Sequence, residues 1–158
     1  MSRAHVITVS DRAAAGQMED GSGPAVAATL AGAGFEVDPV EVVPDESDRI
    51  AAAIRHAASA GCRLVVTTGG TGLGPRDVTP QATAPLLDYP VPGLAEAMRH
   101  AGLARTPLAA LSRGLAGVGG GALIVNLPGS VKGAIESLEA VLPALPHAVQ
   151  LLDGDTAH

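Results

Sequence analysis

The chain has 158 residues, enough to bury a core without disulfides or a metal, and we expect residues 1–158 to form one domain. Its net charge of −6, its scattered Lys and Arg residues and its single Phe and single Tyr argue against nucleic acid as a partner, because neither a basic stripe nor an aromatic stacking surface is present. The polar N-terminus, the lack of an unbroken apolar span and the one cysteine predict a cytoplasmic protein that does not enter a membrane.

The N-terminal segments alternate between strand-like and helix-like patterns. Residues 5–10 ("HVITVS") are apolar and β-branched, which is typical of a buried strand. Residues 11–23 are expected to form a glycine-punctuated loop. A helix is then predicted to begin at Pro24, with Ser22 or Gly23 as its cap, and to stop at the glycines that follow "AVAATLA".

The alternation continues toward the middle of the chain. Residues 35–43 ("FEVDPVEVV") predict a second strand that is irregular around Pro39. The next helix is expected to have Ser47 as its N-cap and to end at Gly61. Residues 63–68 ("RLVVTT") predict a third strand, and a glycine-rich segment follows its carboxyl end.

The C-terminal half contributes further helices and one pair of β segments. Helical pieces are predicted over 79–88 and 92–104, two short β segments around a glycine turn within 108–129, a helix over 130–145 and a last helical piece over 146–154. Strand–helix alternation of this kind predicts a three-layer α/β/α fold with a mostly parallel sheet covered on both faces.

Four notable segments follow predicted strands, and ligands in such sheets bind beyond the carboxyl ends of the strands. They are Ser10-Asp11, Pro44-Asp45, the segment from Thr68 to Asp77, and the segment from Leu127 to Ser130. We therefore expect these four segments to meet at one edge of the sheet.

The segment 67–80, "TTGGTGLGPRDVTP", is the most unusual of the chain. Gly69 and Gly74 have the spacing of a phosphate-binding P-loop, but Pro75-Arg76 replaces the Lys-Ser/Thr pair that such a loop needs, so we reject that assignment. The relaxed Rossmann spacing at Gly117, Gly119 and Ala122 precedes a β segment instead of a helix, and we regard it as accidental.

The physical properties of this segment favour a ligand loop. Glycines let backbone amides approach an anion or a flat ring, Arg76 can meet a phosphate, and Asp77 can hold Mg²⁺ or accept hydrogen bonds. Thr68, Thr71 and Thr79 add hydroxyl donors. The alternative is a flexible turn in which Asp77 caps the following helix.

The run "VVTTGGTGLGPRD" resembles the signature of the molybdenum-cofactor biosynthesis domain, and the stretch through "VTP" resembles the MogA/MoaB proteins, the molybdopterin adenylyltransferase family. The likeness extends over nearly the whole chain. The segments "VSDRAAAG", "DGSGPAV", "VPDE", "PGLAEAMR", "LSRGLAG" and "NLPGS" resemble family segments in the expected order. The resemblance implies the α/β/α fold of that domain.

The resemblance implies an enzyme that uses ATP and Mg²⁺ to adenylylate the phosphate of molybdopterin and releases pyrophosphate. Asp77 in "GPRD" matches the essential loop aspartate of the family, assigned to Mg²⁺-assisted catalysis, and Asp45 in "VPDE" matches the second functional aspartate. A carboxylate suits the paired N–H donors of a pterin edge, and the two roles are interchangeable at this level. The expected substrate-binding residues are Thr68, Gly69, Gly70, Thr71, Gly72, Arg76, Ser112, Pro128, Gly129 and Ser130.

Each assignment has a structural alternative. Asp45 can simply begin the helix with Ser47, Ser130 can be a plain N-cap, and Ser112 with Arg113 can pack a strand end. Asp11 with Arg12 is interpreted as an ion pair or turn lock near the site. Asp20 and Ser22 are interpreted as helix caps. The five histidines show no metal spacing, and Cys62 is interpreted as a small core residue that lacks nearby cations.

Four positions depart from the family pattern, one of them being Leu94, which stands where an aromatic residue is usual. Gln81 follows "VTP" where an acidic residue is usual, Ala95 replaces a glycine and Gly102 stands where serine is frequent. They leave open a second function, a non-catalytic molybdopterin-binding carrier or scaffold of MoaB type, and a third, a nucleotide-processing domain that needs no pterin. The resemblance also implies a trimer or hexamer and a downstream molybdate-insertion protein as a partner.

Overall fold

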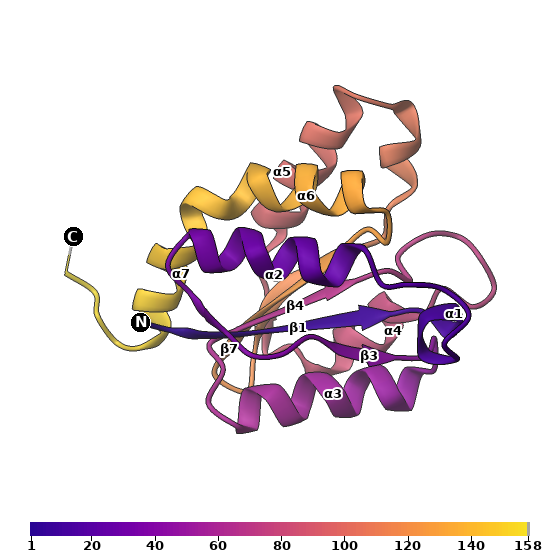
Figure 1. Cartoon of the computed structure of the whole chain (residues 1–158). Coiled ribbons are helices and arrows are strands. Elements are labelled where there is room, and N and C mark those ends of the chain that lie inside the picture. The colour runs from indigo at the N-terminus through magenta and orange to yellow at the C-terminus, as the bar shows by residue number, and fades with distance from the viewer. Residues whose placement is uncertain (158) are drawn as a thin grey trace.

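A computed structural model describes residues 1–157 and places a seven-stranded sheet between two helical layers (Figure 1). The strands are β1 (Arg3–Val9), β2 (Glu36–Val37), β3 (Glu41–Val43), β4 (Leu64–Thr68), β5 (Tyr89–Pro90), β6 (Ala116–Gly119) and β7 (Ala122–Leu127). The helices are α1 (Asp11–Ala14), α2 (Ser22–Gly32), α3 (Ser47–Ser59), α4 (Thr79–Thr83), α5 (Pro92–Leu103), α6 (Val131–Val141) and α7 (Leu145–Leu152). Within residues 1–157 there are also three 3₁₀ helices: η1 (Ala84–Leu86), η2 (Pro107–Leu111) and η3 (Leu142–Ala144).

The sheet has the strand order β2-β1-β4-β7-β6-β5, and β3 also pairs with β1. Pairing is parallel between β1 and each of β2, β3 and β4, and between β4 and β7, while β6 runs antiparallel to β7 and β5. The prediction of a mostly parallel sheet in a three-layer fold is confirmed. Because Thr8 pairs with Thr68 and Thr68 with Leu127, the carboxyl ends of three adjacent strands lie at one edge.

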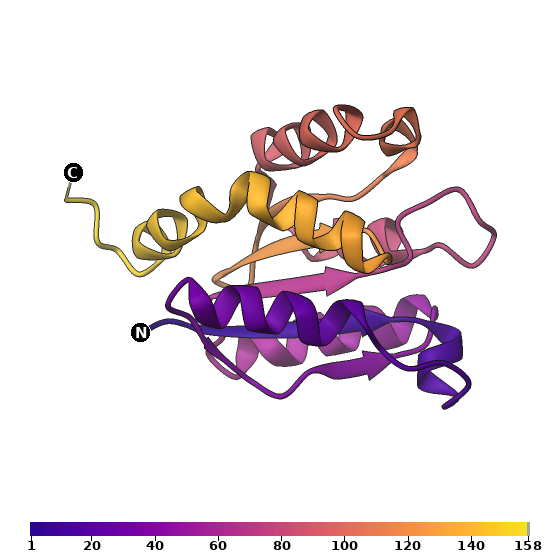
Figure 2. The same cartoon turned by 45° about the horizontal axis from the view of Figure 1, so that its top comes forward.

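Two apolar cores fill the spaces on either side of the sheet. Successive side chains of a strand point to opposite faces, so Val6 joins the core beneath α2, α5, α6 and α7 while Ile7 joins the core against α3 and α4. Figure 2 shows α3 on the other side of β1 from α2 and α6. The central strands β4 and β7 are buried along their whole length, which is why their sequences are continuous apolar runs.

Three elements differ from the sequence prediction. The loop expected at 11–23 contains the one-turn helix α1, because the Ser10 hydroxyl accepts a hydrogen bond from the Ala13 amide at 3.1 Å. The strand expected over 35–43 is two strands, since Pro39 has no N–H and the chain leaves the ladder between β2 and β3. The two-residue strand β5 was not predicted, being too short to show a pattern.

Two helix starts were placed wrongly and one was placed correctly. Helix α2 begins at Ser22, before the expected Pro24, because the Asp20 carboxylate accepts a hydrogen bond from the Gly23 amide at 3.0 Å. Ser47 lies inside α3, whose cap position is Glu46. Ser130 caps α6 as predicted, with its hydroxyl accepting from the Gly133 amide at 3.0 Å.

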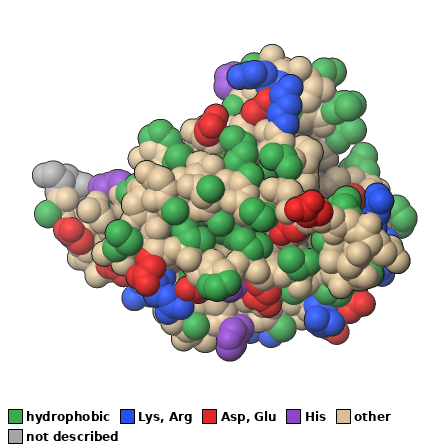
Figure 3. Space-filling model, viewed as in Figure 1, with side chains coloured by type: hydrophobic (Ala, Val, Ile, Leu, Met, Phe, Trp, Pro, Cys, Tyr) green, Lys and Arg blue, Asp and Glu red, His purple; other side chains and the backbone are tan. Residues whose placement is uncertain are grey.

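The surface carries its charges in a dispersed arrangement. On the face shown in Figure 3, apolar and uncharged atoms occupy most of the middle, and the basic side chains lie in small groups toward the rim. None of the helices within residues 1–157 combines the length and the apolar character that crossing a membrane requires.

Candidate functional site

The glycine-rich segment leaves the carboxyl end of β4 in a conformation that only glycine adopts easily. Gly69 and Gly70 have φ values of 93° and 71°, in the left-handed region. The Gly69 amide donates to the Leu127 carbonyl at 3.0 Å, which ties the loop to β7. Thr79 closes the loop from the other end, because its hydroxyl donates to the Gly69 carbonyl at 2.9 Å. The loop therefore begins and ends at one place in the fold.

The Asp77 carboxylate folds back onto this loop. Its Oδ2 accepts a hydrogen bond from the Gly74 amide at 3.0 Å, and Cβ atoms placed at Gly72 or Gly74 would lie 2.9 Å from the same oxygen. The interpretation of Asp77 as a cap of the following helix is wrong, since Val78 occupies the cap position of α4 and no side-chain bond caps it. The two glycines are needed so that a carboxylate can lie against the loop.

Arg113 holds the far side of the loop. Its backbone amide donates to the Thr71 carbonyl at 2.8 Å, its Nε to the Gly72 carbonyl at 2.8 Å and its Nη2 to the Asp77 carbonyl at 2.8 Å. These three bonds fix the loop at its entry, middle and exit. Sequence reasoning noted Arg113 within "LSR" but did not assign it this function, because Gly72 lies 41 residues away in the chain.

Asp45 and Asp11 hold the neighbouring strand ends together. The Asp45 carboxylate accepts from the Asp11 amide at 2.9 Å, and the Asp11 carboxylate accepts from the Asp45 amide at 2.9 Å. Two nitrogens of Arg76 each donate to Asp11 at 3.0 Å. Asp11 does form an ion pair and fix a turn near the site as predicted, but its cationic partner is Arg76, and no ion pair involves Arg12 among the described residues. The guanidinium of Arg76, expected to meet a phosphate, is thus already paired with a carboxylate.

The pKa values of Asp11 and Asp45 are shifted in opposite directions. The hydrogen bond from Arg76, with that from the Asp45 amide, lowers the pKa of Asp11 below its ordinary value. Burial raises the pKa of Asp45, and the nearby charges of Asp11 and Asp77 add to the effect. Asp45 is thus a half-buried carboxylate close to a second one, an arrangement that favours binding of a cation or of paired N–H donors.

A cavity of about 450 Å³ opens at this edge of the sheet. Its wall includes both aspartates that the sequence singled out and the start of the glycine loop, together with residues before α2 and at the start of α6. The predicted site residues that line it are Asp45, Asp77, Thr68, Gly69, Gly70, Gly129 and Ser130. Arg76 is not among its lining residues.

A second cavity of about 290 Å³ lies between α5, η2 and α6, on the other side of the segment Pro128–Ser130. It is lined by four more of the predicted residues, Thr71, Gly72, Ser112 and Pro128, and it shares Ser130 with the larger cavity, whereas Arg76 lines neither cavity. The predicted set thus divides between two adjacent cavities. The sequence offered no sign of this division, because it depends on how α5 packs over α6.

Two of the departures from the family pattern line the smaller cavity. Ala95 and Gly102 both face it from α5, and a Cβ atom at Gly102 would lie 2.7 Å from the Ala109 side chain of η2. A serine at this position would push η2 outward. The smaller cavity of this chain is therefore shaped by the close approach of η2 to α5.

Asn126 is a buried polar residue of the smaller cavity that the sequence analysis did not identify. Its side-chain amide donates to the hydroxyls of Thr67 and Thr83 at 3.0 and 3.1 Å, and its oxygen accepts from the Leu115 amide at 3.1 Å. All hydrogen-bonding groups of the side chain are thus engaged in holding β7 to β4, α4 and β6. The available signal was an asparagine within an apolar strand, just before "LPGS".

Gln81, another of the departures, contacts Arg113 through its side-chain oxygen at 3.2 Å. We expect Gln81→Glu to convert this bond into an exposed ion pair and to raise the free energy of unfolding by no more than about 1 kcal/mol. Denaturant unfolding at low and high salt tests this, because the gain is expected to shrink as salt screens the pair. Gln150→Glu, which adds the same charge on the exposed face of α7, serves as the control. A gain that salt does not reduce would contradict the ion-pair explanation.

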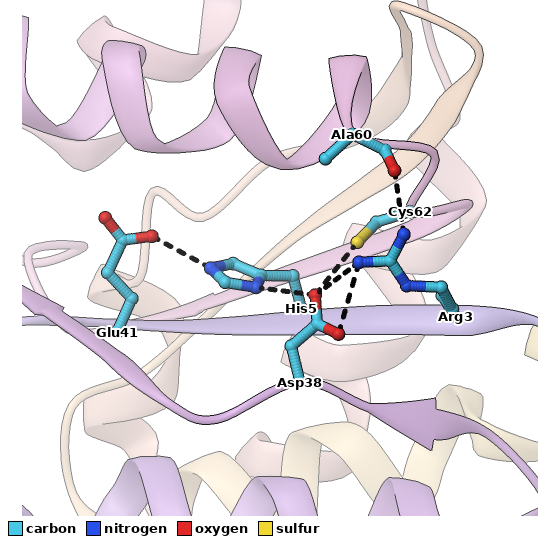
Figure 4. Close-up of polar contacts among 6 residues, drawn as sticks. All are labelled: Arg3, His5, Asp38, Glu41, Ala60 and Cys62. Carbon is cyan, nitrogen blue, oxygen red and sulfur yellow. Dashed lines mark hydrogen bonds and ion pairs between the residues drawn. The ribbon is translucent and has the colours of Figure 1, made fainter.

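Cys62 lies apart from these cavities and is a buried core residue, as predicted, but it does have a cation nearby. Its thiol donates to the Asp38 carboxylate at 3.4 Å, and Arg3 and His5 contact the same carboxylate (Figure 4). Burial, with the hydrogen bond to Asp38, raises the pKa of the thiol to about 11. Cys62 is therefore not an activated nucleophile.

Comparison with known proteins identifies relatives of this chain. Residues 5–147 match the family model described as the probable molybdopterin binding domain. The molybdopterin adenylyltransferase of Helicobacter pylori strain J99 is 43% identical over 155 residues, which cover 95% of this chain and 87% of that protein. The crystal structure of the molybdopterin biosynthesis enzyme MoaB from Thermus thermophilus superposes with a TM-score of 0.92 at 56% identity, covering 98% of both chains.

Some relatives are much longer than this chain. The molybdenum cofactor biosynthesis bifunctional protein of Synechococcus elongatus is 44% identical over 151 residues, and the match covers 96% of this chain but 47% of that protein. The chain thus spans about half the length of that relative. Both the extent of the family match and the identity to relatives of similar length lead to one assignment: the chain belongs to the probable molybdopterin binding domain family.

Proposed function

We propose that this protein transfers the adenylyl group of ATP to the phosphate of molybdopterin. An oxygen of the molybdopterin phosphate attacks the α-phosphorus of ATP, the bond from that phosphorus to the oxygen bridging to the β-phosphate breaks, and pyrophosphate leaves. The products are adenylyl-molybdopterin and pyrophosphate. The observation that carries the proposal is a cavity that is lined by Asp45, Asp77 and the glycine loop and that meets a second cavity along residues 128–130, in a chain of this family.

Two adjacent cavities suit a reaction between two substrates. Their common boundary is the segment from Pro128 to Ser130, which runs against the glycine loop: a Cβ at Gly129 would lie 3.2 Å from the Gly69 Cα. Helix α6 starts at this boundary, and the N-terminal amides of a helix attract phosphate groups. We place the reacting phosphates there, with one substrate extending into each cavity.

The residues at the boundary fit a reaction that needs positioning more than a protein nucleophile. The attacking group is itself a phosphate, so no activated serine or cysteine is required, and the high pKa of Cys62 is no obstacle. The loop amides face the phosphates from a backbone that Arg113 and Thr79 hold in place. Such preorganisation lowers the cost of bringing two charged substrates together.

The carboxylates of Asp45 and Asp77 fit Mg²⁺, which is bound in proteins through one or two carboxylates together with substrate phosphates. Asp45 Oδ2 and Asp77 Oδ2 each accept one backbone hydrogen bond, which orients the two side chains at the same cavity. When bound, the ion would neutralise negative charge on the phosphates. Asp77 is our assignment for the metal ligand, with Asp45 as its partner or as the acceptor for the pterin edge.

The remaining parts of the proposal concern the setting of the reaction. We propose residues 1–158 as one domain acting in the cytoplasm, as the single cysteine suggests, and assembling into a trimer or hexamer. A protein that inserts molybdate is proposed as the next partner, because the adenylylated product is an activated intermediate. The existence of a longer, bifunctional relative supports a close coupling between this domain and a further step.

The test is pyrophosphate release from ATP and Mg²⁺, measured with and without molybdopterin. Release that requires molybdopterin is the expected result. Release at the same rate without the pterin would instead indicate a nucleotide-processing domain. Binding of molybdopterin by calorimetric titration without any release would identify the carrier or scaffold function.

A further inference from the structure

A polar cluster lies on the α3 face of the sheet, near the amino-terminal end of β1 (Figure 4). It unites His5 of β1, Asp38 of the connection between β2 and β3, and Cys62 just before β4. His5 Nδ1 lies 3.3 Å and Cys62 Sγ lies 3.4 Å from the same Asp38 oxygen, and the three donor atoms all lie within 4.8 Å of one another. Ser10 follows His5 by five residue steps along an extended chain, so the cluster is about 16 Å from the proposed active site.

These atoms have the chemistry and the spacing of a zinc site. Zinc binds thiolate sulfur, imidazole nitrogen and carboxylate oxygen at about 2.0–2.3 Å, and tetrahedral angles then place neighbouring donor atoms about 3.3–3.6 Å apart. The distances from His5 Nδ1 and Cys62 Sγ to the Asp38 oxygen, 3.3 and 3.4 Å, are close to these distances between donor atoms. Small shifts of the three side chains would therefore complete three corners of a tetrahedron.

The second ring nitrogen of His5 is held as in known metal-ligating histidines. Nε2 lies 2.8 Å from a carboxylate oxygen of Glu41. Such an outer carboxylate fixes the ring and leaves the other nitrogen toward the metal. A neutral imidazole has one N–H, which can serve Glu41 or Asp38 but not both. A cation at Nδ1 would let the ring donate to Glu41 while both carboxylates remain satisfied.

The charge balance also favours a divalent cation. Arg3 contacts both oxygens of Asp38, at 3.1 and 3.3 Å, and contributes one positive charge. Asp38 and Glu41 contribute two negative charges, of which Arg3 offsets one. A divalent cation with Cys62 as thiolate would bring three positive and three negative charges together, leaving the cluster neutral.

A cation can reach this cluster from solvent. Cys62 is 1% exposed, but the side chains of His5, Asp38 and Glu41 are 14%, 25% and 39% exposed. The cluster therefore has a buried sulfur at its base and carboxylates at its opening. One tetrahedral position remains for water.

We propose that His5, Asp38 and Cys62 form a binding site for Zn²⁺, with Glu41 as the residue that orients the His5 ring. The ion joins β1, the β2–β3 connection and the start of β4, which are far apart in the sequence. It stabilises the folded state, because the unfolded chain does not hold these three ligands together. The site is independent of adenylyl transfer.

The experiment uses the full chain, freed of metal with a chelator and titrated with Co²⁺ as a spectroscopic substitute for Zn²⁺. Cys62 is the only cysteine, so a charge-transfer band from thiolate to Co²⁺ can come from no other residue. We expect this band to saturate at one Co²⁺ per chain, to disappear when Zn²⁺ is added, and Tm to rise with the Zn²⁺ concentration. Binding of Co²⁺ without the band would overturn the proposal.

Variants separate this site from adventitious surface binding. Cys62→Ser keeps a hydroxyl donor for Asp38 but loses the thiolate, and it is expected to lose the band and the Zn²⁺-dependent rise in Tm. His5→Gln is expected to weaken Zn²⁺ binding at least tenfold, and Glu41→Ala about 10- to 100-fold. His56→Gln, on the exposed side of α3, is the matched control and should bind as the native chain does. Unchanged affinity in Cys62→Ser would show that the metal binds elsewhere.

Discussion

Asp77→Asn is expected to reduce molybdopterin-dependent pyrophosphate release by at least about 100-fold without unfolding the protein. Asparagine has nearly the same size, and its side-chain oxygen can still accept the hydrogen bond that Asp77 Oδ2 receives from the Gly74 amide at 3.0 Å. The loop therefore keeps its turn. What is lost is one of the negative charges that line the larger cavity, together with the carboxylate proposed to bind Mg²⁺.

A second consequence of Asp77→Asn concerns Asp45. Part of the rise in the pKa of Asp45 comes from the charge of Asp77, after the larger contribution of burial. Removing that charge is therefore expected to lower the pKa of Asp45, which NMR of the labelled carboxyl carbon can follow. The lowered pKa would show that the two carboxylates interact in solution, independently of any assay.

The control for this variant is Asp88→Asn, which removes one exposed carboxylate before β5, away from both cavities. Its rate of pyrophosphate release should equal that of the native chain. If Asp77→Asn retained full activity while remaining folded, Asp77 would be a structural residue of the loop, and the metal would have to be assigned to Asp45.

Local patterns predicted most of the strands and helices. The apolar, β-branched runs of β1 and β4 and the glycine segment after β4 were identified because each feature lies within a few consecutive residues. Ser130 as a helix cap was correct for the same reason, since the cap and its partner Gly133 are three residues apart. Segments that follow strands were expected at one edge of the sheet, and parallel pairing places them there.

Features that depend on distant residues were not predictable. Arg113 binds a loop 36 to 41 residues earlier, and Asn126 reaches Thr67 across 59 residues. No spacing rule identifies such pairs, because side-chain reach depends on how the helices pack. The cluster of His5 with Asp38 and Cys62 was not predicted for the same reason, because spacing along the sequence was the only criterion applied to the histidines.

A short-range error arose where two side chains could cap the same helix. Ser22 was a reasonable cap by residue type, but Asp20 takes the Gly23 amide and leaves the Ser22 hydroxyl to bond with that of Thr68 at 2.9 Å. This bond ties α2 to the end of β4. Two residues in "EDGSG" can cap, and only the position of β4 decides between them.

Gly69→Ala is expected to lower the free energy of unfolding by at least about 2 kcal/mol and to abolish pyrophosphate release. With φ at 93°, a Cβ at this position is strained, and it would also overlap the carbonyl oxygen of Val9 at the end of β1. Neither β1 nor β4 can yield easily, because both are buried and paired in the sheet. The glycine loop must therefore shift away from Val9 and Gly129, which changes the wall of the larger cavity.

Denaturant unfolding and the pyrophosphate assay together test this prediction, with Gly32→Ala at the end of α2 as the matched control. A Cβ at Gly32 meets no atom within 4 Å, and alanine is favoured over glycine in helices by up to about 1 kcal/mol. The control should therefore be as stable as the native chain or slightly more so. Should Gly69→Ala prove as stable and as active as the control, the loop would be adaptable, and its amides could not be preorganised for the phosphates. Loss of activity with full stability would instead mean that the loop moves as a unit and that its position alone determines the rate.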